Sequence, residues 1–197
     1  MNGKIIKDAL ILFLITVIAG LGLGAVYGIT KVPIEKANYN IQQNAYRTVF
    51  PDAASFEDMD GFDSAKATEA AAAAGYADDT IENCVVAVDA SGAELGYVIS
   101  VTDPNSYGGD VTLSIGVTDD GTLNGYSITT INDTAGLGMK AKEDSFSSQF
   151  AGKQVEVTKT GATSDNQIDA ISGATITSSA VTSAVNAGLA YYRTLAQ

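Results

Sequence analysis

Residues 169–181, DAISGATITSSAV, are rich in small and hydroxyl side chains and lead into a predicted helix. The start of a helix leaves backbone N–H groups without partners and carries a partial positive charge, so it favours a phosphate group. Gly173 and Ala174 are small enough to let an anion approach the backbone. The sequence therefore predicts that residues 172–177 form a phosphate-binding cradle. The simpler alternative is that Ser172 only caps the helix.

The chain has no histidine and a single cysteine, Cys84. It therefore lacks an imidazole base and histidine ligands for zinc or haem, and one cysteine builds neither an internal disulfide nor a thiolate metal site. The carboxylates do not follow the spacing of an EF-hand loop. We expect no hydrolase chemistry, no catalytic acid or base and no metal site. A buried thiol is the default interpretation of Cys84, and a metal shared with a partner stays open.

The elements around residues 169–181 are predicted to be hairpins followed by a helix. Two pairs of apolar runs, over residues 84–101 and 110–131, are each interrupted by a turn, at Ser91-Gly92 and at Asp119-Asp120-Gly121. A further short strand is expected over residues 154–161. Small and apolar residues at helical spacing predict a helix from Thr175 to Leu195, with Ile176, Ala180, Ala184 and Gly188 in one row of its apolar face. This order indicates an α+β fold with a largely antiparallel sheet.

The N-terminal part of the chain contains 22 residues without a charge, Ala9 to Thr30. This is long enough for a transmembrane helix, which needs about 20 apolar residues, and longer than the apolar part of a signal peptide. Pro33 is expected to end it, and a second helix is expected over residues 34–50. A short helix between loops is expected within residues 52–80. The predicted regions are a tip with an anchor (1–31), a spacer (32–80) and a main domain (81–197).

Charge predicts which side of the membrane the main domain occupies. Lys4, Lys7 and the terminal amine precede the apolar stretch, and Lys31 and Lys36 follow it together with Glu35. This bias favours a cytoplasmic N-terminus and an extracytoplasmic main domain. Residues 37–197 carry 21 acidic and 7 basic side chains. Such a surface repels nucleic acid, so no nucleic-acid partner is expected.

Three glycines of the apolar stretch, Gly20, Gly24 and Gly28, recur every four residues on one helix face. Small residues at this spacing let another transmembrane helix approach closely. We interpret the face as a docking surface for a membrane partner, and a chance arrangement is the alternative. The stretch contains no ionisable residue, so this chain alone is not expected to form an ion path.

The complete string from Asp169 to Thr175 resembles the flavinylation motif Asp-x-x-Ser/Thr-Gly-Ala-Thr of the FMN-binding domain family. The resemblance implies one FMN per chain, joined through its phosphate to the hydroxyl of the last threonine, Thr175. It also implies a separate, magnesium-dependent flavin transferase that uses FAD as donor. Thr175 would then be the substrate of that enzyme, which explains why the chain supplies no base beside it. The other site residues expected here are Asp169, Ser172, Gly173, Ala174 and Thr177.

A second stretch, NDTAGLGMK at residues 132–140, is similar to the Glu-Thr-Pro-Gly-Leu-Gly loop of the same family. It has Asp133 in place of Glu and Ala135 in place of Pro. Leu137 is expected against the flavin ring, or else in the core, and Tyr107 of SYGGD (106–110) is expected to stack on the ring or pack at the sheet edge. QFAGK (149–153) also resembles the family. The loop residues expected at the site are Thr134, Gly136, Leu137 and Gly138.

The order of anchor, spacer and FMN-binding domain resembles the family of G subunits of the Rnf complex, the ion-translocating ferredoxin:NAD oxidoreductase. This implies a redox-active electron-transfer subunit of a cell-membrane translocase, with the integral membrane and redox subunits of that complex as partners. A component similar to the C subunit of the Na⁺-translocating NADH:quinone reductase is the first alternative. The others are a stand-alone extracytoplasmic flavin reductase and a module that binds a phosphate-bearing ligand without a covalent bond.

Overall fold

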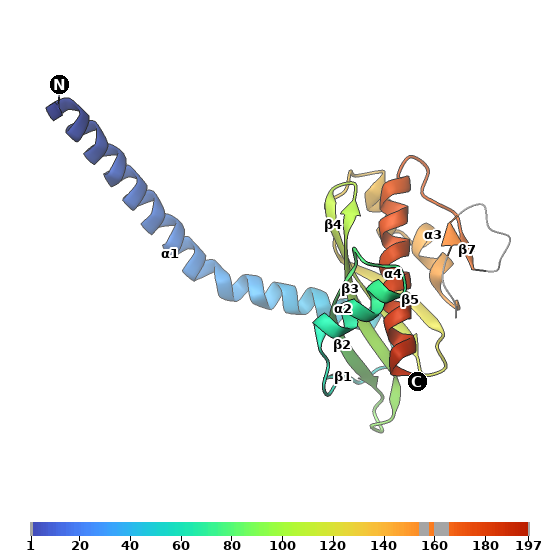
Figure 1. Cartoon of the computed structure of the whole chain (residues 1–197). Helices are drawn as coiled ribbons and strands as arrows, with labels where there is room; N and C mark the ends of the chain where they lie inside the picture. Colours follow the sequence, from blue (N-terminus) through green and yellow to red (C-terminus); the bar gives the residue numbers. More distant parts are fainter. Residues whose placement is uncertain (1, 154–157, 160–165, 197) are drawn as a thin grey trace. The chain divides into compact units, whose positions relative to one another are not determined.

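The computed structural model describes residues 2–153, 158–159 and 166–196 (Figure 1). The chain divides into two compact units, Met1–Ile41 and Gln42–Gln197. The first unit is part of a long helix, α1 (Asn2–Val49). Along residues 5–41 its large apolar side chains are exposed. By length and composition, α1 is the one helix of the described residues that qualifies as a membrane span.

Helix α1 corrects one prediction from the sequence. Pro33 was expected to end the anchor, but it lies inside a helix that continues to Val49. A proline removes one helical hydrogen bond and crowds the preceding turn, yet a helix supported by long helical segments on both sides continues through it. The end predicted for the second helix, near residue 50, is confirmed, because α1 ends at Val49, directly before the Phe50-Pro51 pair.

A five-stranded antiparallel sheet forms the centre of the second unit, with the strand order β1-β2-β3-β4-β5. Its strands are β1 (Ser55–Asp58), β2 (Thr80–Val88), β3 (Glu94–Ser106), β4 (Gly109–Thr118) and β5 (Leu123–Thr130). Both predicted hairpins are present, and the glycines of their turns, Gly92 and Gly121, have φ of 85° and 83°. The edge strand β1 was not predicted, because four residues with two charges show no strand pattern.

The sheet is covered on both faces. Helix α4 (Thr175–Leu195) and α2 (Ser64–Ala73) pack on one face, where α4 runs along β3 and β4 (Figure 1). Residues 46–53 pack on the other face, against Val85, Ala87 and Val98. Burying a valine side chain contributes about 1.5–3 kcal/mol, so packing on both faces stabilises the sheet.

Helix α4 begins and ends where the sequence predicted. Its buried face includes Val181, Val185 and Leu189, and Gly188 lies so close to Ile115 that a Cβ there would be 2.4 Å from its Cδ1 atom. Ile176, expected in the same row as Gly188, is exposed instead. The first two residues of α4, Thr175 and Ile176, therefore present their side chains to the outside of the core, whereas Thr177 and Ser178 are buried.

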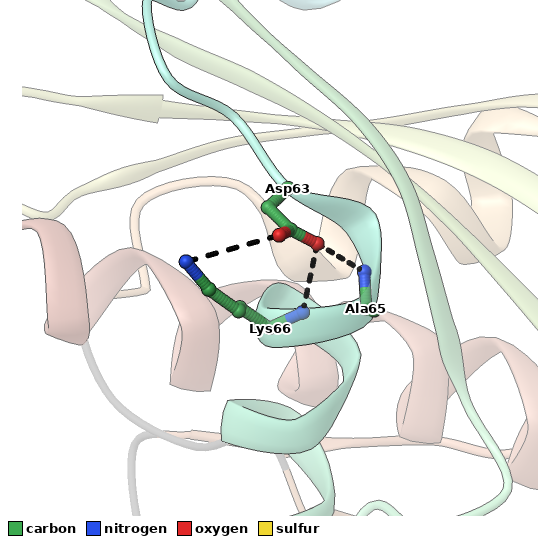
Figure 2. A network of polar contacts seen from close by, with 3 residues as sticks. All are labelled: Asp63, Ala65 and Lys66. Carbon is green, nitrogen blue, oxygen red and sulfur yellow. Dashed lines mark hydrogen bonds and ion pairs between the residues drawn. The ribbon is translucent and has the colours of Figure 1, made fainter.

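The short helix expected within residues 52–80 is α2. Its N-cap is Asp63, whose Oδ1 atom accepts hydrogen bonds from the N–H groups of Ala65 (3.0 Å) and Lys66 (3.3 Å), as Figure 2 shows. The Lys66 ammonium lies 3.8 Å from Oδ2 of the same carboxylate. A cap of this kind contributes about 1 kcal/mol and adds to the high helix propensity of the alanine-rich sequence of α2.

Short elements connect β5 to α4. They are η1 (Gly138–Lys142), α3 (Asp144–Ser147), η2 (Ser148–Phe150) and the parallel pair β6 (Thr158–Lys159) and β7 (Gln167–Ile168). The strand predicted over residues 154–161 lies outside the described residues, except for the two residues of β6. Phe146 and Phe150 are buried, with ring centres 5.4 Å apart, and they fix this connection to the core.

Two buried carboxyl groups lie at the packing surface of α4, β3 and the residue before β2. Asp79 is 1% exposed and accepts a hydrogen bond from the Ser183 hydroxyl of α4 at 2.6 Å. Asp103 of β3 is 2% exposed and accepts one from the N–H of Asn105 at 2.6 Å. Burial raises the pKa of Asp79 to about 7, against the Ser183 hydrogen bond, and the neighbouring Asp103 and Asp78 act in the same upward direction.

We predict that Asp79→Asn makes stability less dependent on pH. Between about pH 4 and pH 7 the folded protein keeps a proton on Asp79 that the unfolded chain has lost, so this group lowers the free energy of unfolding as pH rises. The variant should be more stable than the wild type at pH 8, by up to about 4 kcal/mol, and close to it at pH 4. Urea unfolding across this range measures the difference. Asp52→Asn, at an exposed aspartate that is not among the groups acting on Asp79, is the control and should show little of this difference; a constant difference for Asp79→Asn would contradict the prediction.

Candidate functional site

A cavity of about 530 Å³ lies at the start of α4. Three segments enclose it: the first turn of α4 with the two residues before it, the loop after β5, and the turn between β3 and β4. The residues that line it are Tyr107, Thr134, Leu137, Gly138, Gly173, Ala174, Thr175, Ile176 and Thr177. All nine are uncharged, although the whole chain has a net charge of −12.

The structure brings together most of the site residues expected from the sequence. Tyr107, three residues of the 134–138 loop and the residues from Gly173 to Thr175 share the cavity with Thr177. Gly136 lies in the same loop with φ of 77° but does not line the cavity. Asp169 and Ser172 are exposed and also lie outside the lining. Of the segment 172–177, over which a phosphate cradle was predicted, the last five residues line the cavity.

Capping by Ser172 was the simpler alternative for this segment, and it is wrong. The N-cap of α4 is Ala174, and no side chain makes a cap hydrogen bond there. Ser178 fixes the segment from within the helix, because its hydroxyl accepts from the Ile171 N–H at 3.0 Å and donates to the Ala174 carbonyl at 2.9 Å. The N–H groups of the first turn thus remain available to a group that enters the cavity.

Gln149, in the QFAGK stretch, fixes the beginning of the 169–175 motif. Its Oε1 atom accepts from the Asp169 N–H at 2.7 Å, and its Nε2 atom donates to the Asp169 carbonyl at 3.3 Å. Gly173 follows with φ of 77°, which a side chain rarely adopts, and a Cβ there would lie 3.3 Å from Leu137. The exposed hydroxyl-bearing residue Thr175 is therefore held at the cavity by contacts on both sides of the motif.

Three apolar side chains form the outer wall of the cavity. Within Gln42–Gln197, as far as the structure describes it, the exposed large apolar side chains are Tyr107 (68%), Leu137 (43%) and Ile176 (54%). All three line the cavity. Large apolar groups at the surface of an otherwise polar domain indicate a binding site, and this volume falls in the usual range of ligand pockets. The arrangement fits FMN: a flat apolar surface for the ring, and a helix start with a hydroxyl for the phosphate.

Two residues of the site were not predicted as site residues from the sequence. Ile176 was expected on the packed face of α4 and instead lines the cavity. Asp133, noted only as a departure from the family loop, is 8% exposed and accepts three hydrogen bonds. Their donors are the hydroxyls of Thr177 and of Ser106 (2.8 Å) and the N–H of Gly108 (2.6 Å). A single sequence carries no signal for contacts between residues 25 to 44 positions apart.

Residues 106–190 match the FMN-binding domain family, and this range contains every residue that lines the cavity. Among curated proteins, the chain is 34% identical to the G subunit of the Na⁺-translocating ferredoxin:NAD⁺ oxidoreductase complex of Acetobacterium woodii, over 98% of this chain and 94% of that protein. It is 32% identical to the G subunit of the proton-translocating ferredoxin:NAD⁺ oxidoreductase complex of Clostridium ljungdahlii, over 85% of this chain and 80% of that protein.

A solved structure shares the fold. The C subunit of the Na⁺-translocating NADH-quinone reductase of Parabacteroides distasonis superposes with a TM-score of 0.50 at 24% identity, over 74% of this chain and 78% of that chain. The family resemblance inferred from the two motifs is confirmed by these matches.

We predict that Gly138→Ala destabilises the domain more than Gly136→Ala does. A Cβ at Gly138 would lie 2.3 Å from Asp133 Oδ2 and 2.6 Å from Thr177 Oγ1, whereas a Cβ at Gly136 meets nothing within 4 Å. Overpacking of this kind costs about 2–3 kcal/mol. At Gly136 only the positive φ opposes a side chain, which costs about 1 kcal/mol. Denaturant unfolding of both variants measures the two losses, and equal losses would contradict the crowding described for Gly138.

Proposed function

Because the chain belongs to the family of G subunits of ion-translocating oxidoreductase complexes, we propose that it is an electron-transfer subunit that holds one FMN on Thr175. The observation that carries the proposal is the position of Thr175. It is exposed in the first turn of α4, directly at an uncharged cavity with three apolar side chains at its opening. No other arrangement of the described residues joins a matched flavinylation motif to such a cavity.

The covalent bond is a phosphoester between the FMN phosphate and the Thr175 hydroxyl. A flavin transferase forms it by transferring the FMN part of FAD to the hydroxyl, whose proton is lost while AMP leaves. Among the described residues, the lining contains no carboxylate, amine or imidazole. This supports a role in which Thr175 accepts the group and the transferase supplies the catalytic groups.

The chain's own residues hold and shield the bound group. The N–H groups at the start of α4 stabilise the negative phosphate, and Gly173 permits its close approach. Tyr107, Leu137 and Ile176 cover apolar surface of the ring and keep water from it. FMN supplies the redox chemistry, passing electrons singly between neighbouring redox centres, and the protein sets its position and surroundings.

The helix α1 anchors this domain in the cell membrane. Its apolar length supports a single span, and the lysines before it support a cytoplasmic N-terminus with the FMN-binding domain on the extracytoplasmic side. A covalent bond suits that location, because no cofactor pool replaces an FMN that dissociates there. The proposed partners are the integral membrane and redox subunits of the complex.

A component similar to the C subunit of the Na⁺-translocating NADH:quinone reductase is the second candidate. The shared fold is the observation that favours it. The related G subunits match nearly the whole chain at higher identity, anchor included, so the role of a G subunit is the function we propose.

We predict that Thr175→Ala abolishes covalent FMN. The wild type, produced together with a flavin transferase in the same compartment, should gain the mass of one FMN less one water and give a fluorescent band in a denaturing gel. The variant should give neither, because it lacks the only atom to which the phosphate is joined. Ser179→Ala, one turn further along α4, is the matched control and should be labelled like the wild type.

The outcome separates the alternatives. Loss of the label in Thr175→Ala alone supports the attachment site. An unlabelled wild type, when the same transferase labels a control protein, would contradict the proposal and favour a site for a phosphate-bearing ligand bound without a covalent bond. Absence of partners after mild detergent extraction would favour a stand-alone flavin reductase.

We also predict that Gly24→Leu weakens the association of α1 with its membrane partners. Gly20, Gly24 and Gly28 have no neighbouring atom of this chain within 4 Å of a Cβ position, so the face is free to receive another helix. Gly22→Leu adds the same bulk on the opposite side of α1 and is the matched control. Co-purification from detergent extracts should fall several-fold for Gly24→Leu only. Equal recovery of partners with both variants would contradict a role for this face.

A further inference from the structure

The carboxylate of Asp133 lies directly behind the cavity wall. It is 8% exposed, and it contacts all three segments that enclose the cavity. Its own backbone belongs to the loop after β5. Its Oδ2 atom accepts from the hydroxyl of Thr177 in the first turn of α4, and from the hydroxyl of Ser106 at the end of β3. Its Oδ1 atom accepts from the N–H of Gly108.

The two contacts to the β3–β4 turn fix Tyr107 from both sides. Ser106 precedes Tyr107 and Gly108 follows it, and both donate to Asp133, at 2.8 and 2.6 Å. Gly108 also lies against the backbone before Asp133, because a Cβ there would be 2.4 Å from the Asn132 carbonyl oxygen. An exposed aromatic ring is thus presented by a turn whose backbone is held at two points.

The contact to α4 fixes the helix start in the same way. Thr177 is fully buried and lies two residues after Thr175. Its hydroxyl is directed at Asp133, so it is not directed at the cavity opening. Gly138 closes over this hydrogen bond, with no room for a side chain between Asp133 and Thr177. Charge-assisted hydrogen bonds in a buried setting are the stronger class, and they lose little to water.

We propose that Asp133 is the positioning residue of the flavin site: it holds the first turn of α4 and the Tyr107 turn at a fixed separation. This rests on the proposed function, since the groups it positions are the Thr175 hydroxyl, to which FMN is joined, and the ring wall at Tyr107. Asp133 itself does not line the cavity. It acts through Thr177, Ser106 and Gly108.

The matched variants are Asp133→Asn, Thr177→Val and Thr177→Ser. Asn keeps the shape of the side chain and removes its charge. Val keeps the shape of Thr177 and removes the donor, whereas Ser keeps the donor. If Asp133 positions Thr175 through Thr177, Asp133→Asn and Thr177→Val should each slow the saturating rate of FMN attachment about tenfold, and Thr177→Ser should restore it. The double variant Asp133→Asn with Thr177→Val should attach FMN no more slowly than Asp133→Asn alone.

Two readouts separate positioning from mere stability. The fluorescence anisotropy of the attached flavin should fall in Asp133→Asn and in Thr177→Val, because the ring wall moves more freely. The amide proton of Gly108 should exchange faster in the apoprotein of Asp133→Asn, and this measurement needs no flavin. The temperature of unfolding, measured beside both, identifies a variant that fails to fold; in that case the Thr177→Val and Thr177→Ser pair decides.

Attachment rates and anisotropy equal to the wild type in folded Asp133→Asn or Thr177→Val would overturn this inference while leaving Thr175 as the attachment site. Additive losses in the double variant would overturn it as well, because the two residues would then act independently. An unlabelled wild type would instead contradict the proposed function. Faster exchange at Gly108 in that same experiment would still support Asp133 as the residue that holds the cavity together.

Discussion

A buried carboxylate must find hydrogen-bond donors, because leaving it unpaired inside a protein is costly. Asp133 meets this requirement with donors from β3, from the β3–β4 turn and from α4. The end of β3 with its turn, the loop that carries Asp133 and the start of α4 are far apart in the chain, so satisfying one side chain fixes the relative position of all three. The cavity is the space that remains between them. Its shape therefore depends on a hydrogen-bonding requirement as much as on the packing of the sheet.

The chemistry that the cavity can support depends on the side chains of its lining. The nine residues contain hydroxyls, glycines and apolar groups and no carboxylate, amine or imidazole. Asp79, the carboxyl group whose pKa burial raises to about 7, does not line the cavity and accepts a hydrogen bond from Ser183 in the middle of α4. A lining of this kind offers apolar contacts, hydroxyls and backbone N–H groups to a bound group. Such a lining suits a carrier in which the cofactor performs the redox step and the protein supplies orientation.

Features set by local sequence were predicted well. The turns at Gly92 and Gly121 and the full extent of α4 follow from glycine at turns and from helical periodicity, which act over a few residues. The Thr175 motif was found because all its residues are consecutive. Pro33 was misjudged because a long helix tolerates a proline that would end a short one. The role of Asp133 was missed because its partners lie 25 to 44 residues away, and tertiary contact alone brings them together.

The open form of the cavity follows from a covalent attachment such as the one proposed. A ligand held only by contacts needs a pocket that buries most of its surface. A tether of one phosphoester keeps the ring at an effective concentration in the millimolar range, so weak apolar contacts suffice to hold it. Tyr107, Leu137 and Ile176 would provide such contacts, and they are exposed at the surface. A ring held in this way would remain accessible to a partner, as electron transfer requires. The point of attachment, Thr175 in the proposal, must then be held rigidly. The hydrogen bond from Thr177 to Asp133 lies half a helical turn away from Thr175.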